Sequence, residues 1–341
     1  MKRRERNLVN PYAQSCSFIA VNPKLVFIDH ERIEKYATEL AQKTLQVPAW
    51  RDPVYPESDD KIIEFLGVIN SVNFCFTDFK THKKFDIEYP EGSGKIWSGA
   101  YGMTMCFKRA LDEGTPVLDP QFLMNLSEKD AEHIFRYKNT AIPMLQERIA
   151  NLRNIGHMLG DTLAGFNSFT EIFRLMNFKF LDIVGALSRY FPPSYLDYSY
   201  LNIRTIFFNK RAQLFPMMYH GRALSSEGRL QPIRDPENFG PIADYECPKF
   251  KRARGILRYH PELAKKVDNG VVIPKNSPME VEIRAQDVNS SEDELKKINA
   301  IRLTAGLEPI THAELDYVNW SSGRAPEYKA LRHHYTYTTA Y

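Results

Sequence analysis

Long apolar stretches and clustered cysteines are both absent from this chain of 341 residues. A transmembrane helix needs about 18 or more consecutive apolar residues, and no segment approaches that length. The basic start, MKRRERNLVNPYAQ, is followed by no apolar run of the length that a signal peptide has. The four cysteines lie far apart without a CxxC pair, so neither a disulfide framework nor a structural zinc site is expected. We expect a soluble, non-secreted cytoplasmic protein without a membrane partner.

An excess of charge of one sign is also lacking. Lys and Arg number 45 against 42 Asp and Glu, which gives a formal net charge of +3. Non-specific binding of a polynucleotide needs a strong positive field, and a surplus of three charges does not supply it. We therefore expect no stable nucleic-acid partner. The hydrophobic content of 43% is ordinary for a globular protein and allows a sizeable core.

Several well-known catalytic signatures are missing as well, namely GxGxxG, GxxxxGK[ST], HExxH and GxSxG. Their absence removes the simplest nucleotide-binding, metalloprotease and hydrolase answers. His133 and His157 stand alone on helical segments, whereas a metal site needs converging ligands. The adjacent His333 and His334 would face opposite sides of a strand. We expect no metal ion and no cofactor.

Helical periodicity dominates what is present. We expect helices after an N-cap at Asp29, at 62–76, before Gly114, from Ser127, within 143–190, at 210–222 and from Ser290 to Gly306. The 62–76 run is so apolar that periodicity alone does not separate a buried helix from a buried strand.

Strands are expected at two places. IRTIFF at 203–208 is one, and Met279, Val281 and Ile283, which alternate with charged residues, indicate the other. No internal repeat or linker divides the chain. The predicted architecture is mainly α, with a few short strands, in a single compact domain over residues 1–341 whose first ten residues are flexible.

Asp244 raises the sharpest chemical question. It lies between an apolar approach and a helix-like segment with the basic residues Lys249, Lys251, Arg252, Arg254 and Arg258. A carboxylate just before a helix that begins near Pro248 can cap that helix. The basic residues could form a solvated face, which composition favours, or could hold a phosphate.

Two further stretches carry candidate residues. Lys210 directly follows the strand candidate, so it lies either where the core ends and a pocket begins or on the surface. In DYVNW, Asp316 and Trp320 would share one helix face, which suits a polar group beside an aromatic wall for a planar ligand. Simple packing also accounts for such a patch.

These pieces occur in an order that resembles the queuosine salvage protein family. The motifs, from about residue 8 to the C-terminal tyrosine, are SFIA with VFID, VNFCFTD, WSGAYGM with RALDEGTPV, FPPSY, FFNKRAQL, ADYECP, EVEIRA and LDYVNW. The resemblance implies a mostly helical fold similar to helix-hairpin-helix DNA glycosylases. It also implies an enzyme that hydrolyses the N-glycosidic bond of queuosine 5′-monophosphate and releases queuine, a 7-deazaguanine base, for salvage into tRNA modification.

The resemblance assigns roles to particular positions. Asp244 matches the catalytic aspartate of the ADY motif, and Lys210 matches a lysine near the reacting sugar. The remaining substrate-binding positions lie on the base side and are Tyr55, Ile242, Ala243, Asp316, Tyr317 and Ser321. Three of them depart from the family pattern, since Ser321 replaces an acidic residue, Tyr55 a histidine and Ile242 a phenylalanine. These departures concern base preference rather than the reaction.

The implied reaction explains why a carboxylate is needed. Positive charge develops on C1′ and the ring oxygen as the base departs, so Asp244 would stabilise that charge or attack C1′. A 7-deazapurine lacks N7, so hydrogen bonds to the rest of the base must stabilise its developing negative charge. Asp316, accepting from the guanine-type N–H groups, would give recognition of the base. The 5′-phosphate needs cations, and the candidates are Lys210, Arg211, Lys249 and Arg252.

Two other functions remain open from the sequence. The implied fold permits a DNA base glycosylase, although the net charge of +3 does not favour it. A non-catalytic module for a modified nucleoside or tRNA could stack bases on aromatic residues, with core packing the favoured role of those same rings, Phe74, Phe76, Trp97 and Trp320. The sequence does not indicate the oligomeric state.

Overall fold

The computed structural model describes residues 10–51, 53–161, 165–201, 203–328 and 330–341. Within these ranges it contains fifteen α-helices and four two-stranded antiparallel sheets. The expected mainly α fold with a few short strands is therefore confirmed. The likeness to helix-hairpin-helix glycosylases and the single domain over residues 1–341 remain predictions.

The expected flexible segment at residues 1–10 lies outside the described residues except for Asn10. Asn10 is buried, and its side-chain oxygen accepts hydrogen bonds from the backbone N–H groups of Tyr12 and Ala13. It thereby caps the first described helix, so the chain is already fixed at this residue.

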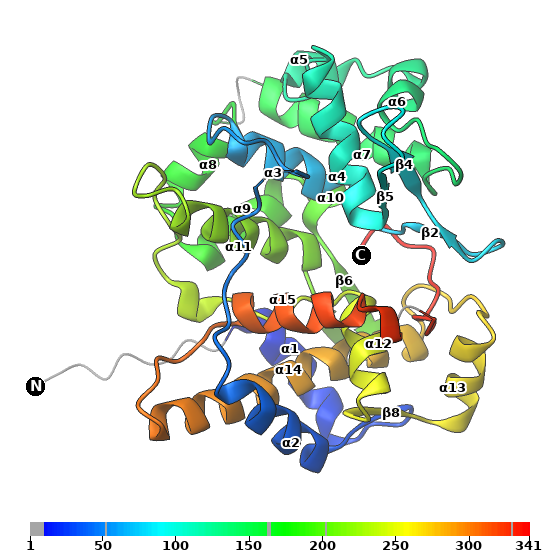
Figure 1. The fold of residues 1–341 in the computed structure, drawn as a ribbon, viewed down its shortest axis with the longest axis vertical. Coiled ribbons are helices and arrows are strands. Elements are labelled where there is room, and N and C mark those ends of the chain that lie inside the picture. Colours follow the sequence, from blue (N-terminus) through cyan, green and yellow to red (C-terminus); the bar gives the residue numbers. More distant parts are fainter. Residues whose placement is uncertain (1–9, 52, 162–164, 202, 329) are drawn as a thin grey trace, which may run out of the picture.

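The helices form two groups, one above the other in Figure 1. The upper group surrounds the largest apolar cluster of the described residues. Its helices are α3 (Ile62–Ser71), α4 (Gly99–Asp112), α5 (Pro120–Met124), α6 (Glu128–Ile134), α7 (Leu145–Gly160), α8 (Phe169–Leu175), α9 (Phe180–Tyr190), α10 (Pro192–Tyr195) and α11 (Lys210–Leu224). Two hairpins belong to it, formed by β2 (Thr77–Asp78) with β3 (Lys83–Lys84) and by β4 (Asp86–Glu88) with β5 (Ile96–Ser98).

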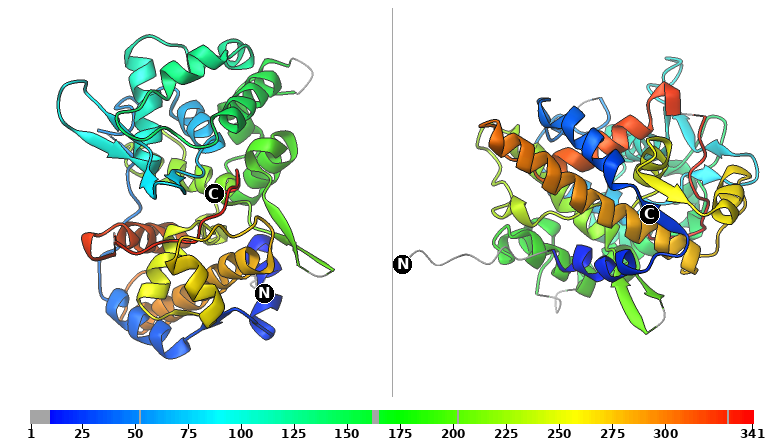
Figure 2. Two further views of the ribbon diagram at one scale, coloured as in Figure 1. Left: turned by 90° about the vertical axis from the view of Figure 1, so that its right-hand side faces the viewer. Right: turned by 90° about the horizontal axis from the view of Figure 1, so that it is seen from below.

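The lower group is held together by three smaller apolar clusters. Its helices are α1 (Pro11–Val21), α2 (His30–Ala41), α12 (Glu246–Ala253), α13 (Pro261–Asp268), α14 (Pro278–Thr304) and α15 (His312–Gly323). The strand β1 (Val26–Ile28) pairs with β8 (Leu257–Tyr259), and the hairpin of β6 (Tyr198–Leu201) and β7 (Arg204–Phe207) projects outward in Figure 2. The C-terminus returns between the two groups, where Tyr341 is buried.

The ambiguous apolar run at 62–76 forms a helix, α3, over its first ten residues. Nine of those ten residues are buried, which explains why the sequence shows no clear apolar face. Gly67 allows a close approach on one side, because a Cβ atom there would lie 2.4 Å from the ring of Phe169. The helix is thus a core element packed on all sides.

The strand expected around Met279, Val281 and Ile283 is wrong. Ser277 accepts a hydrogen bond from the backbone N–H of Glu280 and Pro278 occupies the first turn, so α14 begins here and runs for 27 residues. The N-cap expected at Ser290 therefore lies within the helix. Its end is close to the expected one, since Gly306 follows two residues beyond with a positive φ of 72°.

The charged residues between those apolar positions are buried rather than solvated. Arg284 pairs with Asp197 at 2.5 Å, and Glu282 accepts hydrogen bonds from three consecutive backbone N–H groups that begin at Lys24. Buried polar groups persist where each has a partner. The alternation of apolar and charged residues therefore reflects a buried helix whose charged side chains have partners, and not the two faces of a strand.

Other expected elements are confirmed. Asp29 caps α2 by accepting from the backbone N–H of Arg32 at 3.1 Å, β7 lies inside the expected strand, and α11 covers the helix expected at 210–222. Over the described ranges, no helix combines the length and the apolar character that crossing a membrane requires.

Candidate active site

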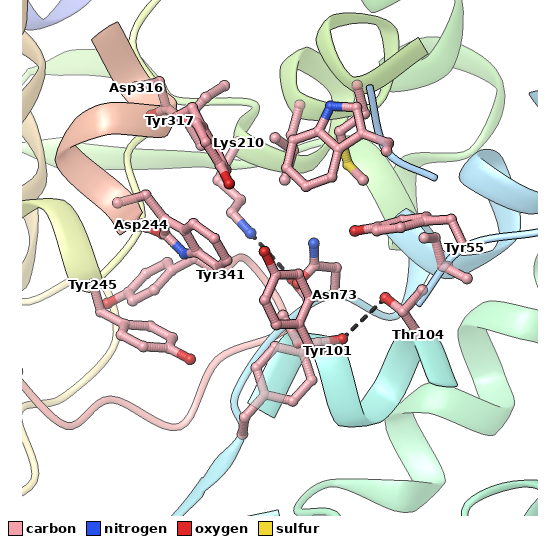
Figure 3. A pocket seen from close by; sticks show the side chains of 18 residues that line it. Tyr55, Asn73, Tyr101, Thr104, Lys210, Asp244, Tyr245, Asp316, Tyr317 and Tyr341 are labelled. Atoms are coloured by element: carbon pink, nitrogen blue, oxygen red, sulfur yellow. Dashed lines mark hydrogen bonds between the residues drawn. The ribbon is translucent and has the colours of Figure 1, made fainter. Parts of the chain in front are cut away.

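A cavity lies between the two groups of helices, and the centres of water-sized molecules can occupy about 70 Å³ of it. Figure 3 shows side chains from both groups converging on it. The lining residues are Trp50, Tyr55, Ile69, Asn73, Phe76, Ala100, Tyr101, Thr104, Lys210, Leu214, Met218, Ile242, Asp244, Tyr245, Asp316, Tyr317, Trp320 and Tyr341.

Asp244 both caps a helix and lines the cavity. Its Oδ1 accepts hydrogen bonds from the backbone N–H groups of Glu246 at 2.9 Å and Cys247 at 3.0 Å, which confirms the capping interpretation. The helix, α12, begins at Glu246 rather than near Pro248. The other oxygen, Oδ2, accepts no hydrogen bond from any described residue. The cap thus fixes the carboxylate while one oxygen stays available to a ligand.

Lys210 is buried at the first position of α11, so a surface role is excluded. Its ammonium group donates to the carbonyl of Asn73 at 3.4 Å, the contact drawn in Figure 3. Burial lowers the pKa of Lys210 to about 8, against the opposing attraction of Asp244. Burial likewise raises the pKa of Asp244, while Lys210 and the two backbone donors oppose that increase. Burial thus disfavours the charged form of each group, while the charge of each favours the charged form of the other.

Asp316 reaches the cavity from α15, on the same helix face as Trp320, as its spacing predicts. Burial, followed by the negative charges of Asp244 and Asp287, raises the pKa of Asp316 well above its usual value. Its Oδ1 lies 3.9 Å from the thiol of Cys247. Burial and these neighbouring charges thus favour the protonated form of Asp316 more than in an exposed aspartate.

Aromatic rings form much of the cavity wall. Trp50 makes edge-to-face contacts with Tyr55 and Tyr317, at centroid distances of 5.5 and 5.7 Å. Tyr101 contacts Trp320 in the same manner at 5.6 Å. These rings offer flat apolar surfaces suited to a planar base.

Two of the expected site residues do not line the cavity. Ala243 is fully buried, and its carbonyl accepts hydrogen bonds from the guanidinium of Arg284. Ser321 donates to the carbonyl of Val318, one turn back on α15. Both therefore support neighbouring residues, whereas Tyr55 and Ile242 do line the space.

The cations weighed for the phosphate are dispersed. Arg211 donates to the carbonyls of Ser71 and Pro193 in the core, and Arg252 pairs with Asp268 on the surface. Neither lines the cavity. Lys249 is buried and pairs with Glu246 at 2.5 Å, and it does not line the cavity.

The solvated basic face favoured for the segment after Asp244 is wrong for Lys249 and Lys251. Lys251 has no exposed surface and lies 3.0 Å from Asp287 and 3.7 Å from Glu294, both on α14. These carboxylates offset the cost of burying its charge. Sequence composition could not reveal partners that lie 36 or more residues away.

Of the four proposed stacking residues, Phe76 and Trp320 line the cavity. Phe74 instead lies under the guanidinium of Arg148 at 4.2 Å, and Trp97 donates to the carbonyl of Tyr89. Core packing thus accounts for Phe74, and a surface hairpin holds Trp97.

Sequence reasoning missed several lining residues, among them Asn73, Tyr101, Thr104, Tyr245 and Tyr341. Three of them, Asn73, Tyr101 and Tyr245, stand inside the family motifs, which was the one signal that could have found them. All four cysteines are buried and free. Among the described residues, no three His, Cys, Asp or Glu side chains gather as a metal ion would require.

A buried cavity that combines carboxyl groups, an ammonium group and aromatic walls defines a small-molecule site of a helical protein. The chain belongs to the queuosine salvage protein family, because the model of that family matches residues 54–341. The family resemblance inferred from the motifs is therefore confirmed.

Curated relatives support the same membership. The chain is similar to a Sphaerobacter thermophilus protein named queuosine 5′-phosphate N-glycosylase/hydrolase, with 29% identity over 93% of each chain. Proteins of that name from Nematostella vectensis and Mus musculus are each 27% identical. The alignments cover 87% of this chain and 84% of the former protein, and 80% of this chain and of the latter.

Proposed function

We propose that this chain is an N-glycosyl hydrolase that cleaves queuosine 5′-monophosphate and releases queuine for reuse in tRNA. One observation carries the proposal, namely that Asp244, whose carboxylate accepts two backbone hydrogen bonds, lines one cavity together with Lys210 and Asp316. The names of the relatives indicate the substrate. The site supplies the chemical groups that cleavage of an N-glycosidic bond needs.

Asp244 acts on the sugar. As the bond between C1′ and the base breaks, positive charge spreads over C1′ and the ring oxygen, and a fixed carboxylate stabilises that charge. In one route water then adds to C1′; in the other, Asp244 forms a bond to C1′ that water hydrolyses. Both routes end with ribose 5-phosphate and the free base, and both require the ionised carboxylate.

Asp316 acts on the base. Its uncharged carboxyl group offers one donor and one acceptor, which matches a guanine-type edge with O6 and N1–H. The hydrogen bond to O6 strengthens as negative charge develops on the departing base. This function extends the recognition expected from the sequence, in which Asp316 would only accept hydrogen bonds.

Lys210 favours the ionised form of the catalytic carboxyl group. Its ammonium group favours the ionised form of Asp244, against the burial that favours the neutral acid. With Asp316 in its protonated form, the opposite charges of Lys210 and Asp244 balance before the substrate binds. The cavity therefore binds a sugar without a large excess of local charge.

The base-side departures from the family pattern affect preference. Tyr55 packs against Trp50 and Phe65, and Ile242 adds an aliphatic surface, so this wall is apolar. Ser321 lies off the cavity wall. We expect the substituent of the substrate base to be held by aromatic and apolar contacts more than by ion pairs.

A panel of nucleoside 5′-monophosphates, analysed by mass spectrometry of the products, tests the proposal. Queuine release from its own nucleotide, with much slower release of guanine and adenine, is the expected result. Release of ordinary purines at equal rates would contradict the assigned substrate. Salt-sensitive binding of duplex DNA, or stabilisation by queuine without turnover, would instead favour the glycosylase or the binding module.

A further inference from the structure

Arg324 lies beside the cavity without an acidic partner. Its guanidinium stacks on the rings of Tyr101 and Trp320, 4.6 Å from each centroid, and both rings line the cavity. The residue is half-buried, just after the end of α15. Within the described ranges, its guanidinium makes no ion pair and no hydrogen bond. Its N–H donors are therefore available to a ligand.

Lys84 approaches the cavity from the hairpin formed by β2 and β3. Its ammonium group lies 5.9 Å from the ring centre of Tyr245, another lining residue, and pairs with Glu246. About a third of the Lys84 side chain is exposed, whereas Glu246 is almost fully buried. The ammonium group of Lys84 is thus held by a buried carboxylate, while part of the Lys84 side chain remains exposed.

Lys249 competes for the same carboxylate. It pairs with Glu246 at 2.5 Å, so two ammonium groups share one acid. Both cations outweigh the effect of burial and lower the pKa of Glu246 to about 2. His333, stacked on Tyr245 at 4.1 Å, adds no charge near neutral pH, because burial lowers its pKa to about 4.

Lys249 and Arg324 both affect the pKa of Lys84. The pKa of Lys84 is lowered by burial, and the repulsion of Lys249 and Arg324 contributes against the attraction of Glu246. Three positive charges and one negative charge therefore leave an excess of two beside the cavity. A phosphate monoester carries about 1.5 to 2 negative charges at neutral pH, which matches this excess.

We infer that Arg324 and Lys84 form the binding site of the 5′-phosphate, with Arg324 as its principal ligand. The inference rests on the proposed function and replaces Arg211 and Arg252, which point elsewhere. The guanidinium fork, in contact with two aromatic rings, can bind phosphate oxygens in pairs. Lys84 adds a second positive charge, while Lys249 keeps Glu246 neutralised.

The test compares kcat/KM for queuosine 5′-monophosphate with kcat/KM for queuosine. We expect Arg324→Gln to reduce kcat/KM for the monophosphate by about tenfold to a hundredfold, chiefly through KM, as loss of a charged hydrogen bond does. The ratio of the two kcat/KM values should fall with it. Lys84→Gln should act in the same direction, and the surface variant Arg252→Gln is the matched control. A ratio in Arg324→Gln equal to that of the wild type would overturn the inference.

A second measurement does not depend on turnover. Titration of the wild-type protein with inorganic phosphate should raise its melting temperature, and Arg324→Gln should abolish that rise. An equal rise in melting temperature in both proteins would refute the phosphate-binding site at Arg324. Failure of the wild type to release queuine, together with a phosphate response that needs Arg324, would refute the proposed substrate and leave the anion site in place.

Discussion

Asp244 and Asp316 face the same cavity, and after burial the negative charge of Asp244 is the largest cause of the raised pKa of Asp316. Burial raises the pKa of both acids, and the increase is the larger for Asp316. Asp244 has two backbone donors and the attraction of Lys210, which favour its ionised form, whereas burial and the charge of Asp244 favour the protonated form of Asp316. Paired carboxyl groups with separated pKa values commonly divide the work of an acid and an anion.

Substitution of Asp316 distinguishes an uncharged acid from a carboxylate. The amide of Asp316→Asn keeps one donor and one acceptor, so we expect its kcat to stay within about tenfold of wild type. Asp316→Ala removes both, and its kcat should fall by about a hundredfold to a thousandfold, as after loss of one preorganised donor. The measurement is steady-state release of queuine. Equal losses in the two variants would show that the carboxylate form is the active one.

Activity should decline in alkaline solution as Lys210 loses its proton. The pKa of Lys210 is lowered to about 8, so its positive charge is present below that pH and absent above it. The loss of this charge weakens the stabilisation of the Asp244 carboxylate, and kcat/KM should fall as the pH rises through about 8. The profile of kcat/KM from pH 7 to 10 is the measurement. The substrate phosphate titrates near pH 6, so it does not affect this limb.

Lys210→Arg is the control for the alkaline limb. A guanidinium stays protonated over this range, so a variant that remains active should lose the decline near pH 8. An unchanged decline in this variant would assign the limb to another group.

Two helical glycines predict opposite effects on stability. A Cβ atom at Gly156 in α7 would lie 2.1 Å from the backbone nitrogen of Met124, so Gly156→Ala should destabilise the protein by about 1–3 kcal/mol or more. Gly185 in α9 has no atom within 4 Å of such a Cβ, and Gly185→Ala should stabilise it by about 0.5–1 kcal/mol. Urea unfolding measures both. Equal free energies of unfolding for the two variants would contradict the packing of α5 against α7.

Much of the fold could be predicted where local signals agree with the tertiary structure. Asp29 caps α2, and β7 leads directly into α11, because cap residues and apolar runs act over a few residues. α14 could not be predicted in the same way. Its Glu282 and Arg284 are satisfied by Lys24 and Asp197, residues distant in the chain, so a buried helix resembled an exposed strand.

In the candidate site, too, some residues could be predicted from local motifs and others could not. Asp244, Lys210 and Asp316 stand in motifs that the sequence displays, and the structure brings them to one cavity. Arg324 and Lys84 carry no local signal, because their significance comes from contacts with rings supplied by other segments. Charge excess at a cavity is a property of the folded chain and becomes visible only when the distant cations are placed together.

The most direct test of the account is the rate of queuine release by Asp244→Asn under single-turnover conditions. The amide keeps an oxygen that can accept the hydrogen bonds of the α12 cap but lacks the negative charge, so the fold should persist. We expect a rate at least about a hundredfold below that of wild type, a barrier increase of about 3 kcal/mol or more. A correctly folded Asp244→Asn protein that releases queuine at the wild-type rate would contradict the central role of this carboxylate.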